Sequence, residues 1–132
     1  MTKKQKSDLA SRLSVFLDEA IRDPYEGVRK FDLDGDLAVC VGWISDADPA
    51  DPDLVYSKED PRYALAAGIK CRRDSDWSDY ESLDSPTDAD GNALCCDTLL
   101  TRRDDCDEMA EGAVEEYEEL LGGLRDGSVR LC

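Results

Sequence analysis

Residues 28–44 read VRKFDLDGDLAVCVGWI, and this stretch decides the fold. Apolar residues alternate with other residues on both sides of an Asp-Gly pair at 34–35. A period of two is that of a β-strand, and Asp-Gly between alternating runs is a strong hairpin signal, because a type I′ turn needs positive φ at both central residues. The stretch therefore predicts an antiparallel hairpin with strands near 28–33 and 36–44.

The residues before the hairpin predict an amphipathic helix. Apolar side chains recur every three or four positions from Lys3 to Arg22, which places them on one face of a helix. Thr2 and Gln5 have the spacing of a capping box. Asp23-Pro24 ends the pattern, because a residue before proline avoids helical geometry.

The residues after the hairpin predict a loop and two further strands. The loop covers 45–61, where three prolines each follow an aspartate. Apolar runs at 63–72 and 93–101 are expected to form the third and fourth strands. Asp90-Gly91 would be the turn that leads into the fourth strand.

The C-terminal part of the chain predicts a second helix, over 105–121. Its apolar residues again recur with helical spacing, and its first turn is acidic, which suits the positive end of a helix dipole. We expect its cap to lie in 101–104 and its end at Gly122-Gly123. The tail 127–132 is expected to be extended.

This order of elements predicts a single α+β domain over residues 1–132. Strands joined by turns and one long loop favour an antiparallel sheet of three to five strands, with the N-terminal and the C-terminal helix packed on one face. The charged residues that alternate along the first strand indicate that the opposite face of the sheet is open to water and acidic.

The charge balance is the most unusual property of the chain. It has 16 Lys and Arg against 32 Asp and Glu, no His, and a formal net charge of −16. Such a charge repels nucleic acids and anionic membranes, so we expect neither as a direct partner. The expected partner is a basic protein surface, in particular that of a nucleic-acid-binding protein.

The N-terminal segment and the cysteines indicate a cytoplasmic protein. The N-terminal segment is amphipathic, unlike the apolar core of a secretory signal, and no run approaches the ~20 apolar residues of a membrane span. The chain has six Cys at irregular spacing. In a reducing cytosol they are expected to be thiols, and Cys40, Cys71 and Cys95-Cys96 lie in apolar runs where cysteine acts as a small hydrophobic residue.

No motif indicates catalysis or a cofactor. Without His the chain lacks the commonest general base near neutral pH, and it has no phosphate-binding loop and no nucleophile-elbow motif. The cysteines do not have zinc-site spacing. Both Asp-Gly stretches fail as calcium loops, because the first ligand position falls on Lys30 or Pro86. We therefore expect a non-enzymatic protein with no catalytic residue, metal or cofactor.

Two acidic patterns form the candidate binding surface. In loops such as 76–92, DWSDYESLDSPTDADGN, acids lie two residues apart, a spacing of about 6.6 Å on one face of an extended chain. On the second helix, acids form a stripe opposite the apolar face. The candidate residues are Asp46, Asp48, Asp74, Asp76, Asp79, Glu81, Asp84, Asp88, Asp90, Glu108, Glu111, Glu115, Glu118 and Glu119.

Trp77 and Tyr80 have two interpretations. Aromatic residues are enriched in interface hot spots, so both are candidate interface residues. Together with Leu83 they recur at three-residue spacing. That spacing equally suits side chains that anchor the acidic segment to the core.

In size and charge the chain resembles small DNA-mimic inhibitors from phages and mobile elements, such as anti-restriction and anti-CRISPR proteins. The resemblance is one of composition without a shared motif, and it implies an inhibitor that occupies a site built for phosphates. Two alternatives stay open. One is a structural or accessory domain whose acidity serves solubility or adaptation to high salt, and the other is a module that responds to cations.

Overall fold

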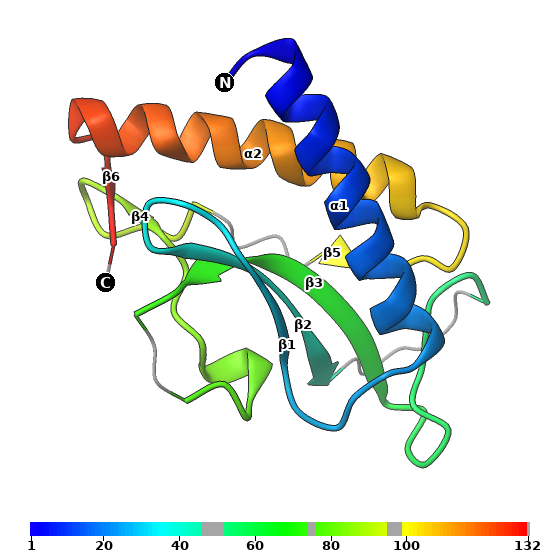
Figure 1. Cartoon of the computed structure of the whole chain (residues 1–132). Coiled ribbons are helices and arrows are strands. Elements are labelled where there is room, and N and C mark those ends of the chain that lie inside the picture. The colour runs from blue at the N-terminus through cyan, green and yellow to red at the C-terminus, as the bar shows by residue number, and fades with distance from the viewer. Residues whose placement is uncertain (46–51, 74–75, 95–98, 132) are drawn as a thin grey trace.

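Two helices lie on one face of an antiparallel sheet, which confirms the predicted α+β class (Figure 1). The computed structural model describes residues 1–45, 52–73, 76–94 and 99–131. The elements in chain order are α1 (Lys3–Arg22), β1 (Arg29–Asp32), β2 (Leu37–Ser45), β3 (Tyr63–Cys71), the short 3₁₀ helix η1 (Tyr80–Ser82), β4 (Thr87–Asp88), β5 (Leu99–Leu100), α2 (Cys106–Asp126) and β6 (Val129–Arg130).

The hairpin of β1 and β2 forms where the sequence predicts it. The two strands are antiparallel, with Asp32 opposite Ala38. Positive φ occurs at Gly35 and Asp36, one residue later than the Asp-Gly pair that was expected at the centre of the turn. β3 then pairs along the whole of β2, and β5 completes a sheet with the order β1-β2-β3-β5.

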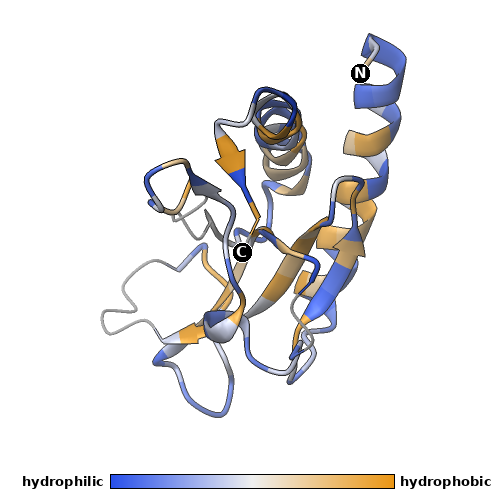
Figure 2. Cartoon of the chain, turned by 90° about the vertical axis from the view of Figure 1, so that its left-hand side faces the viewer, coloured by the Kyte–Doolittle hydropathy of each residue, from blue (hydrophilic) through white to orange (hydrophobic). Residues whose placement is uncertain are grey.

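The main hydrophobic core lies between the two helices and the inner face of the sheet. Leu17 of α1 and Tyr117 of α2 are buried in one cluster with Val39 and Ile69 of the central strands. The Tyr117 hydroxyl accepts a 3.0 Å hydrogen bond from the Asp34 N–H, which ties α2 to the β1–β2 turn. Figure 2 shows the apolar central strands in orange and the polar first turns of α1 in blue.

The outer face of the sheet is also covered, so the prediction of an open, wet face was wrong for the central strands. Five outward residues of β2 and β3 are small, which lets another segment pack directly on them. They are Ala38, Cys40, Gly42, Ala66 and Gly68. Tyr80 and Leu83 lie there and are only 2% and 4% exposed. The described residues 76–83 before β4 therefore form a third layer.

The start of α2 differs from the prediction, whereas α1 matches it. Thr2 and Gln5 form the predicted capping box of α1. α2 begins after Asp105, which makes no side-chain capping hydrogen bond. Thr101 does not cap the helix, because it is buried and its hydroxyl donates to the Leu65 carbonyl oxygen (2.9 Å).

The predicted end of α2 was wrong, because Gly122 and Gly123 lie inside the helix. The helix continues to Asp126 and ends at Gly127, where φ is +83°. A Cβ on Gly123 would lie 2.1 Å from Val129 Cγ2, whereas a Cβ on Gly122 would meet nothing within 4 Å. Gly123 therefore makes room for β6 against the helix.

The described part of the predicted strand over 93–101 contains β5 and an isolated bridge at Ala93. Residues 95–98 lie outside the described residues. The turn at Asp90-Gly91 is present, since Thr87 forms an isolated bridge with Ala93 across it. β4 also pairs with β6, which confirms the expected extended tail.

Alanine substitutions at the two helical glycines are expected to shift stability in opposite directions. Gly122→Ala removes a glycine from a helix interior at an open position, and we expect it to raise the free energy of unfolding by about 0.5–1 kcal/mol. Gly123→Ala would press against β6, and we expect a loss of about 1–3 kcal/mol. Urea unfolding followed by circular dichroism measures both values. Equal stabilisation by the two variants would show that β6 does not dock on α2.

Candidate protein-interaction surface

Tyr80 holds the acidic segment after β3 against the outer face of the sheet. Its side chain lies in a slot between two glycines. A Cβ on Gly42 would lie 2.7 Å from Tyr80 Cβ, and a Cβ on Gly68 would lie 2.6 Å from Tyr80 Oη. The anchoring interpretation is therefore confirmed for Tyr80, whose buried ring is not exposed to a partner.

Two lysines of the sheet contact the aromatic rings of this segment. The Lys70 ammonium lies 4.9 Å from the centroid of the Tyr80 ring, and the Lys30 ammonium lies 4.6 Å from the centroid of the half-buried Trp77 ring. Such cation–π contacts contribute about 0.5–2 kcal/mol each. Lys70 is itself buried and donates to the Ser85 hydroxyl (3.2 Å). The lysines thus hold the segment in place and offset part of its negative charge.

Local hydrogen bonds order the acids of this segment. The hydroxyl and N–H of Ser78 donate to Asp76 Oδ1, which lowers the pKa of Asp76. Asp79 caps η1 by accepting from the Glu81 N–H (3.0 Å). These acids and Asp84 have exposed side chains. The segment is therefore an anionic layer fixed over the outer face of the sheet.

α2 carries the row of acids that the sequence predicts. The exposed members recur every three or four residues, so they share one side of the helix. They are Glu108, Glu111, Glu115 and Glu119, defined here as the glutamate row. Within the part of the chain that the structure describes, none of them forms an ion pair. Glu118 differs, because an ion pair with Lys6 of α1 lowers its pKa.

The turn after β4 lies beside the C-terminal end of α2 (Figure 1 and Figure 2). The turn starts from Asp88, the last residue of β4, and includes Asp90. The N–H groups of Asn92 and Asp90 donate to Asp88 Oδ1 (2.9 Å each), and the Asn92 side chain donates to Asp88 Oδ2 (3.2 Å). These bonds, those from Asn92 above all, lower the pKa of Asp88. Asp88 is therefore a fixed anion next to the helix.

The structure separates the predicted acids into two groups. Those of 76–84 lie over the outer face of the sheet, whereas α2 lies over the inner face, so the two groups face different sides. The turn at Asp88 joins the second group. Asp46, Asp48 and Asp74 lie outside the described residues.

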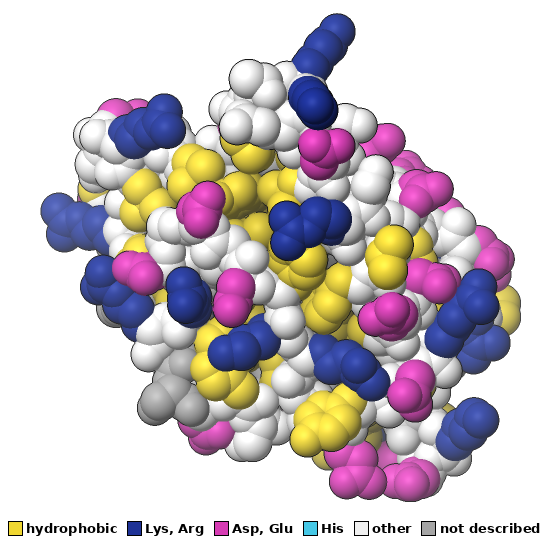
Figure 3. Space-filling model, viewed as in Figure 1, with side chains coloured by type: hydrophobic (Ala, Val, Ile, Leu, Met, Phe, Trp, Pro, Cys, Tyr) yellow, Lys and Arg dark blue, Asp and Glu magenta, His cyan; other side chains and the backbone are white. Residues whose placement is uncertain are grey.

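Basic residues compensate part of the acidity away from α2. Arg72 pairs with Asp32 at 3.7 Å, and Arg73 pairs with Asp36 at 3.0 Å. On the face shown in Figure 3, Lys and Arg side chains stand among the Asp and Glu side chains. By contrast, the sequence of α2 contains a single base, Arg125, in its last turn. The glutamate row is therefore the stronger candidate for a surface that binds a cationic partner.

Two acids near the end of α2, Glu116 and Asp126, were not among the predicted site residues. They line a groove together with Asp88 and Glu119. The predicted helix end at Gly122 excludes Asp126. Helical spacing continued seven residues beyond Glu119 reaches it, so the signal was present in the sequence.

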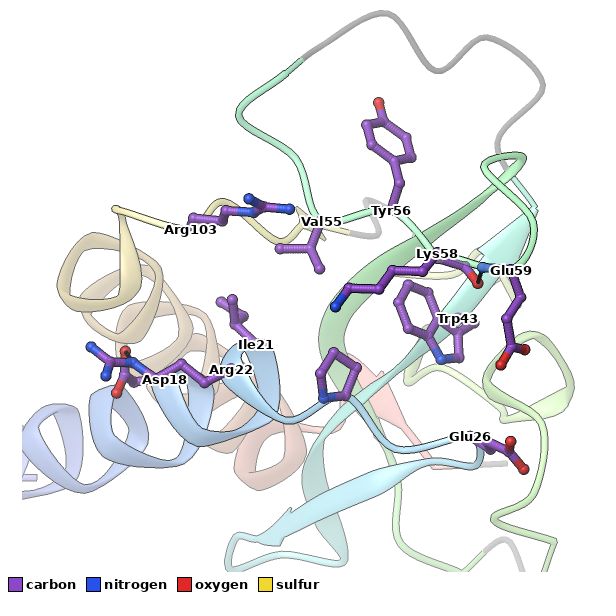
Figure 4. A pocket seen from close by; sticks show the side chains of 12 residues that line it. Asp18, Ile21, Arg22, Glu26, Trp43, Val55, Tyr56, Lys58, Glu59 and Arg103 are labelled. Atoms are coloured by element: carbon purple, nitrogen blue, oxygen red, sulfur yellow. Dashed lines mark hydrogen bonds and ion pairs between the residues drawn. The ribbon is translucent and has the colours of Figure 1, made fainter.

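A cavity of about 670 Å³ lies at the C-terminal end of α1 (Figure 4). Its apolar lining includes Trp43, whose Nε1 donates to the Tyr25 carbonyl oxygen (3.1 Å). Among the described residues, the charged side chains that line it are Asp18, Arg22, Glu26, Lys58, Glu59 and Arg103. Because acids and bases are equal in number, the cavity does not favour a ligand of either charge.

The two thiols of the central strands are structural. Cys40 and Cys71 are buried in the central strands. Burial raises the pKa of Cys40 to about 12, so this thiol is protonated at neutral pH and is a poor nucleophile. Cys40 therefore matches the prediction of a small hydrophobic residue. Cys95, Cys96 and Cys132 lie outside the described residues.

No family model, curated protein or solved structure matches the chain. Neither helix, over the ranges that the structure describes, is long and apolar enough to cross a membrane. Among those same residues, no three or more Cys, Asp or Glu side chains are grouped so as to hold a metal ion.

Gly42→Ala is expected to displace Tyr80 and loosen the acidic segment. The new methyl group would clash with Tyr80 Cβ, which is fixed to the backbone, and we expect a loss of about 1–3 kcal/mol in the free energy of unfolding. Gly68→Ala would clash only with the hydroxyl oxygen. Tyr80→Phe should therefore recover part of the Gly68→Ala loss and none of the Gly42→Ala loss.

Urea unfolding of the single and double variants measures these couplings. If Tyr80→Phe adds independently to both glycine substitutions, the slot does not hold the ring as described.

Proposed function

We propose that this protein is a non-enzymatic acidic binding protein that inhibits a nucleic-acid-handling protein by covering its basic surface. The observation that carries the proposal is the glutamate row, none of whose members forms an ion pair with a cation of the described residues. The proposal makes it a cytoplasmic DNA-mimic inhibitor of the anti-restriction or anti-CRISPR type, acting for a phage or mobile element.

The geometry of the glutamate row supports this proposal. Residues three or four apart on a helix are separated by about 4.5–6 Å along its axis. One strand of DNA carries a phosphate about every 3.4 Å along the helix axis, so the row offers a sparser but periodic line of charge. Ala110, Tyr117 and Leu120 are buried and fix α2 on the core. Binding would therefore require ordering of the glutamate side chains but not of the helix that carries them, which limits the entropic cost.

The same glutamates oppose folding of the isolated domain. Like charges four residues apart on a helix destabilise it by about 0.2–0.5 kcal/mol per pair, and Glu111, Glu115 and Glu119 form two such pairs in series. A cationic surface would relieve this repulsion. The glutamates that lower the folding stability of the free protein would therefore raise its affinity for a cationic partner.

Capture at low ionic strength followed by competition tests the proposal. Immobilised protein is exposed to a cell extract at about 50 mM salt, where charge attraction is weakly screened. Each captured protein is then tested for displacement by DNA and RNA oligonucleotides. We expect a nucleic-acid-binding protein that oligonucleotides displace and whose affinity falls steeply with salt. If no captured protein is displaced in this way, the proposal is wrong.

Neutralising the glutamate row makes the test specific. The quadruple Glu→Gln variant should lower the affinity for the captured partner by about tenfold or more and reduce its salt dependence. A matched control removes the same number of charges from exposed acids elsewhere. The control substitutions are Asp8→Asn, Glu19→Gln, Glu26→Gln and Glu59→Gln. Equal weakening by both variants would show that net charge, and not the row, determines binding.

The two alternatives from composition predict other outcomes. A high-salt domain would show a large rise in its unfolding midpoint in molar KCl and no specific partner. A cation-responsive module would release or absorb heat when titrated with calcium. In the Asp-Gly loops, Asp36 already binds Arg73, and Asp88 already binds Asn92. These contacts reduce the number of carboxylate oxygens available to a cation.

A further inference from the structure

An apolar groove of about 560 Å³ opens where the turn after β4 approaches the C-terminal end of α2. Leu120 and Val129 are buried at its base, and Leu94, which is 42% exposed, forms a wall. Gly122 leaves the helix side open, since a Cβ there would meet nothing within 4 Å. The groove therefore presents apolar surface to solvent.

Carboxylates surround this apolar groove. They come from Asp88, Glu116, Glu119 and Asp126, and the described residues that line the groove include no Lys or Arg. Asp88 is fixed by the hydrogen bonds of its turn. The hydroxyl and N–H of Ser128 bind Asp126, the N–H at 2.8 Å from Oδ1, and lower the pKa of Asp126. Two of the four carboxylates on the rim, those of Asp88 and Asp126, are therefore held in place.

We propose that this groove binds an extended segment of a basic protein in which apolar side chains alternate with arginines. The inference rests on the proposed function and names the part of the surface that would recognise the partner. Apolar side chains of the segment would cover Leu94 and Leu120. Arginine has an apolar stem and a planar head that binds carboxylates with two hydrogen bonds, so it suits the rim.

The combination of apolar base and anionic rim selects this occupant. Nucleic acids and anionic lipid headgroups are repelled by the rim. A purely apolar segment would remove water from the carboxylates without replacing it by a partner, which is unfavourable. A free metal ion would bind only the carboxylates and leave the apolar side chain of Leu94 exposed to water. A segment that carries both kinds of side chain complements both parts of the groove.

Two fluorescent peptides of equal charge test the inference on the intact protein. One has four Leu-Arg repeats and the other has four Gly-Arg repeats. Fluorescence anisotropy at about 0.3 M NaCl, where exposed charges are strongly screened, measures both affinities. We expect the Leu-Arg peptide to bind about tenfold more tightly, because its leucines bury apolar surface in the groove. Equal affinities would overturn the inference.

Substitutions in the groove locate the peptide. Leu94→Ser, at an exposed position, should remove most of the preference for the Leu-Arg peptide and leave Gly-Arg binding unchanged. Gly122→Lys places a cation and an apolar stem in the groove, so it should weaken binding of both peptides several-fold. Circular dichroism verifies that both variants are folded. A preference that survives both substitutions would show that the peptide binds elsewhere.

A charge-matched pair separates the rim from the net charge. Glu116→Gln with Glu119→Gln should weaken binding of both peptides by about tenfold at low salt. Asp8→Asn with Glu19→Gln removes the same charge from exposed positions on α1 and should change binding much less. Equal effects of the two pairs would contradict a groove-specific site.

The experiments distinguish failure of the groove inference from failure of the proposed function. A selective Leu-Arg peptide site without any captured nucleic-acid-handling protein would support the groove and remove the inhibitor. A captured partner that oligonucleotides displace, but that binds the Leu94→Ser protein as well as the original protein, would support the inhibitor and overturn the groove.

Discussion

The antiparallel pairing of β2 with β3 is the constraint on which the rest of the structure depends. The two strands pair in register over their full length, so their backbone groups are satisfied within the sheet. Large apolar side chains such as Val39 and Ile69 point inward, and the two helices bury them. Small outward residues such as Gly68 admit a second cover on the other face. Because these few segments supply the core, most other positions of the chain can be charged without loss of packing.

Features set by neighbouring residues could be predicted from the sequence. The capping box of α1 and the β1–β2 hairpin depend on residues a few positions apart, and both form. The predictions that were wrong concern features that depend on contacts between residues far apart in the sequence. The alternation in β2 shows small residues at Cys40 and Gly42, but it cannot show that Tyr80 lies on them. Glycine is common at helix ends, but Gly123 lies inside α2, where the absence of a side chain makes room for Val129.

The sequence also predicted only part of the candidate surface. Helical spacing alone identifies the glutamate row, because i, i+3 and i+4 residues share a face. It does not distinguish Glu118, whose charge is compensated by Lys6 of the other helix. Nor does it bring Asp88 and Leu94 to the end of α2, which requires the pairing of β4 with β6. Tertiary contacts thus decide which acids act together.

The separation between the slot for Tyr80 and the glutamate row has a consequence for how the sequence can diverge. Gly42 and Gly68 have almost no acceptable replacements while Tyr80 is kept, since a Cβ at either position would clash with that buried side chain. Positions such as Glu111 and Glu115 contribute nothing to packing, so they can exchange charge, length or polarity without altering the frame. Substitutions can therefore accumulate on this one helix while the sheet keeps its packing. Related sequences would then share the glycines and Tyr80 and differ most at the exposed positions of α2.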